Sequence, residues 1–326
     1  MARMKPPNDH LVSRGYQNNF ADVYRRVMVF DVATGASGLV PTRRNFSEPN
    51  FNTYIDSNGH TIRELERDWM QIEGTVLDRI RRITPTSRAS SEAEDVVALF
   101  AIHLVRSQAF RAAHLRIAAD YRDNGLLELA NHPLAIRAFR NEYGRDPKPG
   151  DLTAIAKSLW EGNATSNRSF ADSMRTQYNG ISQMLSRFKI QVITIDPRCG
   201  GLVIGDVPVV HANTKTDQYG FRDQLAIGDA DVIIGPLSRY TAVALSVGHL
   251  SIGNRLVRGY VAHTHVSTKR LLNQINAIFW RAATQVVACH PEDARDVDHL
   301  RRNLDRISLS DILTNPTVAR NLGRRG

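Results

Sequence analysis

Four charged or titratable residues lie where apolar side chains would be expected. Glu66 and Glu73, one heptad apart, border the apolar stripe of one helical pattern, and His103 and Arg106 lie in a second pattern that is apolar nearly all round. Because burying an unpaired charge costs on the order of several kcal/mol, we expect the two helices to pack antiparallel, with the glutamates meeting Arg106 and His103. Such a set is suited to acid–base chemistry on a ligand, or it is a buried ion pair that fixes helix register. The sequence leaves both open.

The opening stretch NDHLVSRGYQNNF, residues 8–20, sets polar and aromatic residues together before any regular pattern begins. His10 and Arg14 are four residues apart, so they would share one side of a helical turn. We predict that this stretch docks onto the core and that His10 and Arg14 face the same cleft as Arg106. The alternative is a leader that only covers a sheet edge.

The C-terminal half contributes loop residues and a pair of histidines. Asp206 follows the strand-like run LVIG, where an aspartate forms a turn or binds water or a metal. Ser238 lies between two apolar runs without the GxSxG elbow, so a serine hydrolase is not indicated and the residue is a ligand-binding candidate. His263 and His265 would point to one side of a strand, but no HExxH pattern or carboxylate accompanies them, so no metal site is predicted.

Composition restricts the class of protein. The chain has 326 residues, of which 42% are hydrophobic, and it has no apolar run long enough to cross a membrane. The two cysteines form no CxxC pair, so we expect a cytoplasmic protein without a thiolate metal site or disulfide framework.

The net charge is +9, and only six of the 42 basic residues are lysine. Arginine-rich surfaces suit nucleic acid or a nucleotide, but a GC-rich genome would also replace lysine by arginine.

The pattern of elements predicts an α+β fold that is mainly helical, with a small antiparallel or mixed sheet and with helices segregated from strands. Neither GxGxxG after a strand nor GxxxxGK[ST] occurs, so classical dinucleotide and P-loop folds are not indicated. KIQVITID and LVIGD, joined by PRCGG, are expected to form a hairpin. We expect one compact domain, residues 1–326, whose parts are an N-terminal motif segment 1–20, a long helix pair 62–122, a β-rich segment 190–246 and a closing helix 267–290.

Several blocks of the chain, from about residue 9 to 290, resemble the bacterial family known as domain of unknown function 4238. In the opening block, the residues that fit the pattern of the family are His10, Val12, Tyr16 and Phe20. Ser13 stands where the family usually has proline, and Gln17 stands where it often has leucine. VYRRVMVFDVATG is similar to the next strand of the family, and the two helix glutamates match a glutamate pair. The central helix motif of the family is similar to FAIHLVRSQAFR, and the resemblance implies a role for His103, Arg106 and Arg111. Gln108 stands where the family often has proline. The later blocks of the family are similar to three segments of this chain: IGDVPVV, IGPLS and INAIFWRAATQVVA. In the first of these, Gly205 replaces a serine of the family, and in the last, Asn276 matches an asparagine of the family.

The resemblance supports a set of residues but implies no reaction. The candidate catalytic residues are His10, Glu73, His103 and Asp206, and the candidate ligand-binding residues are Arg14, Arg106, Arg111, Ser238 and Asn276. Our first hypothesis is a pocket for an anionic ligand, in which arginines hold phosphate oxygens and Glu73 or His10 is a general base. A nucleic-acid- or nucleotide-acting hydrolase of toxin or phage-defence type would be one version. The alternative is a non-catalytic binding or interaction protein whose buried charges are structural. The sequence indicates neither a cofactor nor an oligomeric state.

Overall fold

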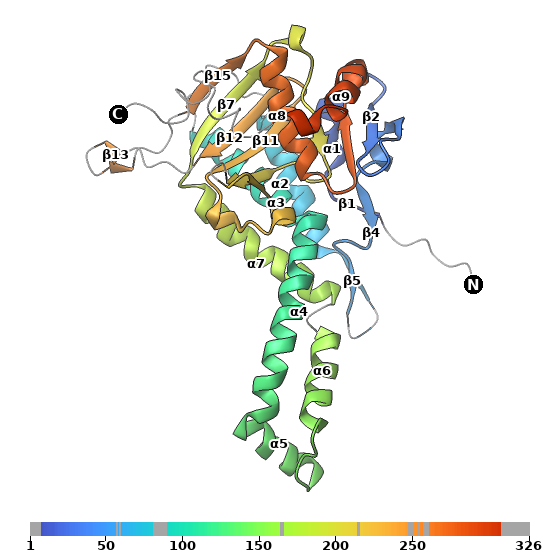
Figure 1. Ribbon diagram of the computed structural model, residues 1–326, viewed down its shortest axis with the longest axis vertical. Coiled ribbons are helices and arrows are strands. Elements are labelled where there is room, and N and C mark those ends of the chain that lie inside the picture. The colour runs from blue at the N-terminus through green and yellow to red at the C-terminus, as the bar shows by residue number, and fades with distance from the viewer. Residues whose placement is uncertain are drawn as a thin grey trace.

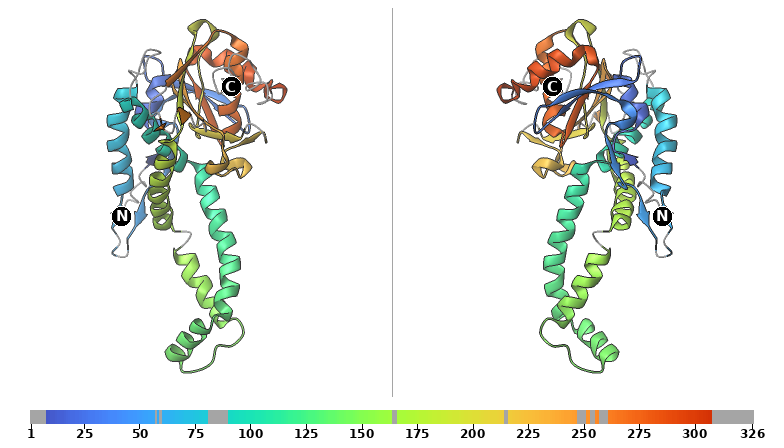
Figure 2. Two further views of the ribbon diagram at one scale, coloured as in Figure 1. Left: turned by 90° about the vertical axis from the view of Figure 1, so that its left-hand side faces the viewer. Right: turned by 90° about the vertical axis from the view of Figure 1, so that its right-hand side faces the viewer.

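The computed structural model describes residues 8–56, 58, 60–80, 90–163, 166–213, 216–246, 251–252, 255–256 and 261–307. Its body contains two β-sheets with helices on either side, and a helical arm extends away from the body (Figures 1 and 2). One continuous cluster of buried apolar side chains draws on the N-terminal segment, the helices and both sheets. The single-domain organisation stays a prediction.

The larger sheet has six strands in the order β10-β9-β11-β12-β7-β15. β15 runs parallel to β7 and all the other neighbours are antiparallel. The central strands are rich in Val, Ile and Ala because both of their faces are covered, by α8 on one side and by α3 and α7 on the other, with α2 outside them (Figure 2). The strands are β7 Lys189–Ile195, β9 Val210–Asn213, β10 Gln218–Tyr219, β11 Val232–Ser238, β12 Thr241–Ser246 and β15 Val261–Val266.

A second sheet of four strands, in the order β3-β2-β16-β8, joins distant parts of the chain. It consists of β2 Arg26–Asp31, β3 Ser37–Pro41, β8 Ile204–Gly205 and β16 Val286–Cys289. The expectation of a small sheet is therefore wrong, because strands from the N-terminal and C-terminal parts of the chain pair with each other at long range. The expected hairpin is also wrong: β7 and β8 belong to different sheets, because the PRCGG turn leads the chain from one sheet to the other.

Three two-stranded ladders complete the set of strands in the described part of the chain, two in the N-terminal region and one in the C-terminal half. The two-stranded ladders are β1 Asn8–His10 with β4 Ser47–Pro49, β5 Tyr54–Ile55 with β6 Thr61–Ile62, and β13 Ser251–Ile252 with β14 Arg255–Leu256. The opening stretch continues from β1 into helix α1 Arg14–Gln17 and the 3₁₀ turn η1 Asn18–Phe20. Val12, Tyr16 and Phe20 of this stretch are buried, so it is part of the core.

Three helices carry the expected long pair. They are α2 Glu64–Ile80, α3 Ser90–Val105 and α4 Gln108–Asn131. The sequence pattern predicts a second helix that runs unbroken to about residue 122, but the chain bends by 56° between α3 and α4. The break has a local cause: the Ser107 hydroxyl donates to the Leu104 carbonyl at 3.2 Å and accepts from the Phe110 amide at 3.1 Å, which caps the new helix.

The arm consists of most of α4 with α5 Pro133–Tyr143 and α6 Asp151–Asn163, and α7 Asn167–Leu185 returns the chain to the body (Figure 2). His132 caps α5, Pro133 occupies its first turn and Gly144 ends it with φ of 62°, as the asymmetry of helix termini requires.

The C-terminal part packs on the larger sheet as α8 Lys269–Ala282, followed by β16 and α9 Ala294–Arg301 (Figure 1). The expected closing helix, 267–290, is therefore too long at its C-terminal end. Its Val-Val-Ala-Cys run pairs with β2 because β-branched residues favour a buried strand there. Among the described helices, no single one is long and apolar enough to span a membrane, and the bent pair α3–α4 meets that test only when its two parts are taken together.

Candidate functional site

Arg106 is the centre of a buried polar cluster. Its guanidinium is fully buried and donates from Nη2 to Glu66, at 3.1 Å from Oε1 and 3.2 Å from Oε2, and from Nη1 to Oε2 of Glu73 at 3.2 Å. Arg79 meets Asp95 at 3.1 Å near the other end of the helix pair, so α2 and α3 run antiparallel. The predicted pairing of Glu73 with Arg106 is confirmed, and Glu66, the further candidate, binds the same guanidinium.

The N-terminal ladder and the loop after β4 brace the outer side of this cluster. Asn52 donates from Nδ2 to Oε2 of Glu66 at 2.6 Å, and its backbone amide donates to Asp9 at 2.8 Å. Asp9 is itself buried, accepts from the Thr53 hydroxyl at 2.9 Å and pairs with Arg63 at 3.1 Å. A chain of hydrogen bonds thus connects Arg106, through Glu66, Asn52 and Asp9, to the exposed Arg63.

His103 lies on the inner side of the cluster. Its ring stacks on Tyr16 with centroids 4.8 Å apart, and its Nε2 is 3.9 Å from Oε1 of Glu73. Burial, with the Arg106 charge adding to it, lowers the pKa of His103 to about 3, so its imidazole is neutral at pH 7. The Tyr16 hydroxyl donates to the Pro236 carbonyl, and this bond links the opening stretch to the larger sheet.

The Ser13 hydroxyl, at a position where the family that the chain resembles usually has proline, makes two hydrogen bonds. It accepts from the Tyr16 amide at 3.3 Å and caps α1. It also hydrogen-bonds to Glu73 and thereby lowers the pKa of that carboxyl. Burial is nevertheless the largest effect, and the pKa of Glu73 lies above its ordinary value, with Arg106 opposing the rise.

Several buried polar atoms of the cluster have no hydrogen-bond partner among the described residues. They are Nε of Arg106, Oε1 of Glu73, both ring nitrogens of His103 and Nε2 of His10. Folded proteins pair the large majority of their buried polar atoms, and an unpaired one costs about 1–3 kcal/mol. The cluster therefore offers donors and acceptors beyond those that hold its helices together.

His10 and Arg14 are separated by the structure. His10 is half-buried, hydrogen-bonds to the backbone of Arg43 and is close enough to Arg106 and Glu66 to feel both charges. Burial and then Arg106 lower the pKa of His10, so its imidazole is neutral at pH 7. Arg14 is on the exposed face of α1, so of the two residues only His10 approaches the cluster. The predicted shared cleft is therefore wrong for Arg14, because the short helix turns that side chain to solvent.

Arg111 lies on the N-terminal turn of α4. Its guanidinium carbon is 5.3 Å from the ring centres of both Phe51 and Phe170, and Nη2 donates to Oδ1 of Asn167 at 2.9 Å. Glu48 is 3.8 Å away and has a pKa raised by burial. These contacts hold the loop after β4 against α4 and α7.

The remaining predicted site residues belong to other contacts. Asp206 is buried and accepts from the amides of Thr284 and Gln285, both at 2.9 Å, and from the Thr284 hydroxyl. Asn276 accepts from the Val203 amide and donates to the Gly201 carbonyl, both at 3.0 Å. Ser238 accepts from the amide two residues on, within the β11–β12 turn. None of these hydrogen bonds involves the Arg106 cluster.

The histidine pair of β15 shows no metal arrangement. His265 is exposed and its Nδ1 is 3.2 Å from the Thr194 hydroxyl, whereas the side chain of His263 lies outside the described residues. Across the described parts of the chain, no three His, Cys, Asp or Glu residues are grouped so as to hold a metal ion.

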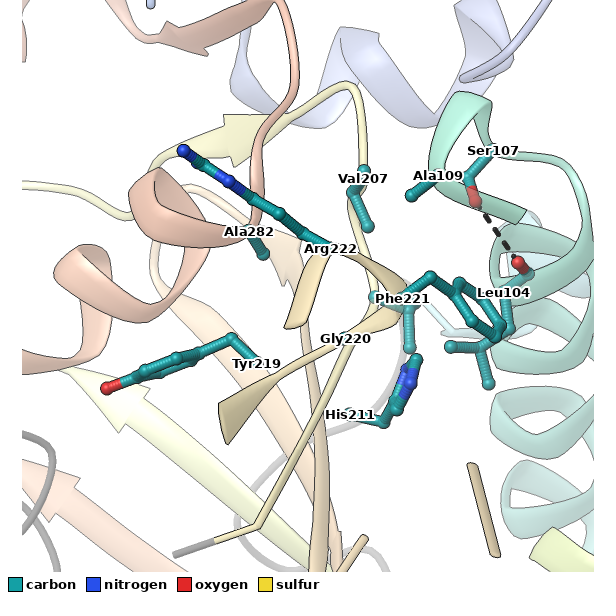
Figure 3. Close-up of a pocket in the computed structure, with 11 residues that line it drawn as sticks. Leu104, Ser107, Ala109, Val207, His211, Tyr219, Gly220, Phe221, Arg222 and Ala282 are labelled. Atoms are coloured by element: carbon teal, nitrogen blue, oxygen red, sulfur yellow. Dashed lines mark hydrogen bonds between the residues drawn. The ribbon is translucent and has the colours of Figure 1, made fainter. Parts of the chain in front are cut away.

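A small pocket beside the α3–α4 break was not predicted from the sequence. Figure 3 shows His211 and Phe221 on one side of it and Leu104 and Ser107 on the other. Burial lowers the pKa of His211 to about 4, and its Nε2 is 3.0 Å from the Leu225 carbonyl. The sequence gives no signal for this residue, because a single histidine in an apolar strand has no characteristic spacing. The same is true of Asp9 and Asn52, whose roles depend on long-range packing.

Comparison with known proteins gives one match. The model of a family described as protein of unknown function (DUF4238) matches residues 8–293. No curated protein and no solved structure matches the chain.

Proposed function

Given that the chain belongs to the DUF4238 family of proteins of unknown function, we propose that it is a hydrolase that cleaves a phosphate ester of a nucleotide or nucleic acid at the Arg106 cluster. A toxin or phage-defence role is one biological setting for such an activity. The family match spans every residue of the cluster but assigns no reaction to it.

The observation that carries the proposal is the concentration of unpaired buried polar atoms around one arginine and two carboxylates. A register-fixing ion pair would need only the contacts between Arg106 and the glutamates. His10 and His103 add three ring nitrogens that those contacts do not use. A ligand that donates and accepts hydrogen bonds would satisfy them, as expected of a site rather than of a purely structural network.

Two groups of the cluster have complementary proton states. His10 is neutral at pH 7, and its buried Nε2 has no hydrogen-bond partner among the described residues, so this atom is available to take a proton from a bound water molecule. Glu73 has a raised pKa, which favours the protonated form that can donate. The water oxygen bonds to phosphorus as the phosphorus–oxygen ester bond breaks, Glu73 protonates the leaving oxygen, and both groups then exchange their protons with solvent.

Arg106 acts in this proposal as a positioning residue. Both of its terminal nitrogens already bind carboxylates, and the side chain is buried. It therefore fixes Glu66 and Glu73 and lowers the pKa of His10. The negative charge of the substrate would be met by exposed arginines such as Arg43, whose backbone hydrogen-bonds to His10.

The test is a hydrolysis assay with fluorescent single-stranded RNA and DNA and with an activated phosphodiester, across a pH series. We expect His10→Gln to reduce the rate by about 10²–10⁴-fold, the usual contribution of a general base. Because the general base works unprotonated and the general acid works protonated, the wild-type rate should rise with pH through the lowered pKa of His10 and fall again as Glu73 loses its proton. His265→Gln, at an exposed histidine outside the cluster, is the matched control. Equal rates for His10→Gln and wild type would refute the proposal.

One observation favours the second candidate, a non-catalytic protein with structural charges. Glu66 is held by both Arg106 and Asn52, so this half of the cluster is well satisfied without a ligand. In that case every variant would change stability and none would change a rate.

A further inference from the structure

The turn between η1 and β2 presents an aromatic ring to solvent on a rigid support. Val23 is 90% exposed and Tyr24 is 74% exposed, which makes them the two most exposed of the large apolar side chains in the described part of the chain. Asp22 holds the turn: its Oδ1 accepts from the amides of Tyr24 at 2.9 Å and Arg26 at 2.8 Å, and its Oδ2 accepts from the Arg26 guanidinium. The exposed residues are therefore held in place by several bonds.

Arg25, at the end of this turn, has a left-handed backbone with φ of 59°. A non-glycine residue in that region costs about 1 kcal/mol or more and persists only where its surroundings fix it. Here the Arg25 amide donates to the Asp22 carbonyl and the Arg25 carbonyl accepts from the Thr42 amide, at 2.9 and 3.0 Å. Strain is thus retained in a turn whose side chains contribute little to the core.

The bond to Thr42 places the 3₁₀ helix η2 Thr42–Arg44 beside the turn. Arg25, Arg43 and Arg44 carry their charge at the surface, and none of them forms an ion pair with a described residue. We call Val23, Tyr24, Arg25, Arg43 and Arg44 the Tyr24 surface. The strand β2, which begins directly after Arg25, lies at the same edge of the body as β1 and α1 (Figure 1).

Two carboxylates beside the Tyr24 turn are already paired with other arginines. Asp22 binds Arg26 at 2.8 Å, and Glu292, from the 3₁₀ turn that packs against β2, binds Arg239 at 2.8 Å. The arginines of the surface thus retain their positive charge for an anionic partner. Arg26 lies over the Tyr24 ring with its guanidinium carbon 4.8 Å from the ring centre, and the ring keeps an exposed area for stacking.

From this arrangement we infer that the Tyr24 surface binds single-stranded nucleic acid. Tyr24 stacks on a base, Arg25, Arg43 and Arg44 contact the phosphates, and an unpaired strand is required because its bases are free to stack. The inference rests on the proposed function and names its substrate class. His10 hydrogen-bonds to the backbone of Arg43, so a strand held by this surface would lie next to His10, at the edge of the Arg106 cluster.

The test measures binding apart from chemistry. A fluorescein-labelled oligothymidylate and oligouridylate are titrated by anisotropy with the full chain carrying Glu73→Gln, alone and combined with changes in the surface. Tyr24→Ala should weaken binding at least about fivefold, the lower end of a stacking contribution, and Tyr24→Phe should restore it. Arg43→Ala with Arg44→Ala should reduce the slope of log affinity against log salt by about 1.4, because each phosphate that an arginine neutralises on a single strand contributes roughly 0.7 to that slope.

Matched controls lie on the arm. Tyr143→Ala removes another exposed tyrosine, and Arg116→Ala with Arg137→Ala removes the same charge from helical positions outside the Tyr24 surface. These variants should bind within about twofold of the parent, because surface changes away from a contact typically cost at most about 0.5 kcal/mol. A duplex of the same sequence should bind more weakly than the single strand.

The two proposals fail separately. If the oligonucleotide binds through the Tyr24 surface but the wild type does not cleave it, the inference stands and the hydrolase proposal falls. If the wild type cleaves it and the Tyr24 and arginine variants bind as tightly as the arm controls, the inference is overturned and the hydrolase proposal stands. An absence of binding to either strand, including the case in which the surface takes a protein partner, also overturns the inference.

Discussion

Two groups of buried polar side chains in this protein differ in how fully they are satisfied. Asp206 uses both of its carboxylate oxygens on the turn that follows α8, and Asn276 uses both of its amide atoms on the chain around Gly201. The Arg106 cluster is equally buried, but the His103 ring has no hydrogen bond to any described residue. Arg106 and Glu73 each have one side-chain atom without a hydrogen-bond partner among the described residues. Burial is the same in the two groups, and saturation of hydrogen bonds is the difference.

This difference separates a structural role from a candidate site. A polar group whose partners are all supplied by a neighbouring loop contributes to the fold and has nothing left for a ligand. A cluster that keeps free donors and acceptors is less stable than it could be, as functional sites often are. Substitutions in the two groups should therefore change stability in different ways, and the following predictions test that.

The largest effect on stability should come from Arg106→Ala. Removing the cation leaves Glu66 and Glu73 buried without their partner, and breaking a buried ion pair from one side costs about 3–5 kcal/mol. Urea denaturation followed by circular dichroism measures the loss. The control replaces all three members by apolar residues of similar volume, Arg106→Met with Glu66→Leu and Glu73→Leu. It should lose less stability than Arg106→Ala, because its remaining cost is the buried Asn52 amide left without its acceptor. A loss below about 1 kcal/mol for Arg106→Ala would mean that the guanidinium is not buried in solution.

Asp206→Ala should have the next largest effect. It removes the charged acceptor of two amides and a hydroxyl on an exposed turn. Hydrogen bonds to a charged group contribute about 1.5–3 kcal/mol, so we expect a loss of about 1.5–3 kcal/mol. Asp206→Asn keeps one oxygen acceptor and should lose less. If the two variants lose the same stability, the carboxylate is not the acceptor that closes this turn, and the comparison with the Arg106 cluster fails.

Glu73→Gln should change the pH dependence of stability. The pKa of Glu73 is raised, so the folded state holds a proton that the unfolded state releases; the contribution to stability is complete below the ordinary value of 4.5 and is lost as pH rises through the folded pKa. The variant should therefore lose less stability than the wild type as pH rises from 4.5. Unfolding free energies over a pH series give both slopes. Parallel slopes would show that the pKa of Glu73 is the same in the folded and unfolded states.

His103→Phe should have the smallest effect at pH 7. The ring nitrogens have no hydrogen bond to a described residue and the stacking on Tyr16 can be kept, so we expect a change within about 1 kcal/mol, as for swaps of similar volume. The wild type should lose stability as pH falls below 6.5 towards about 3, because only the unfolded state takes up the proton, and the variant should lack this contribution. A reduction in stability as large as that of Asp206→Ala would show that His103 is part of a satisfied network.

The predictions from the sequence were best where a local pattern met a strong energetic rule. Glu66, Glu73 and Arg106 could be paired in advance, because periodicity placed each on an apolar face and an unpaired buried charge is too costly to persist. The same logic does not reach Asp9 or Asn52, which lie outside the helices and have no helical period. It also misplaced Arg14, because four-residue spacing indicates a shared helix side but not whether that side faces the core.

The sequence by itself determined where most of the helices lie and which charges needed partners, since both depend on spacing along the chain and on the cost of burial. The tertiary structure alone decided which strands share a sheet, as in the pairing of β16 with β2, because strand pairing depends on contacts between residues far apart along the chain. It alone also decided that Asp206 is saturated while the described surroundings of His103 leave its ring nitrogens unpaired. Whether a buried polar atom finds a partner depends on what the rest of the fold brings to within about 3 Å of it, and no local pattern encodes that distance.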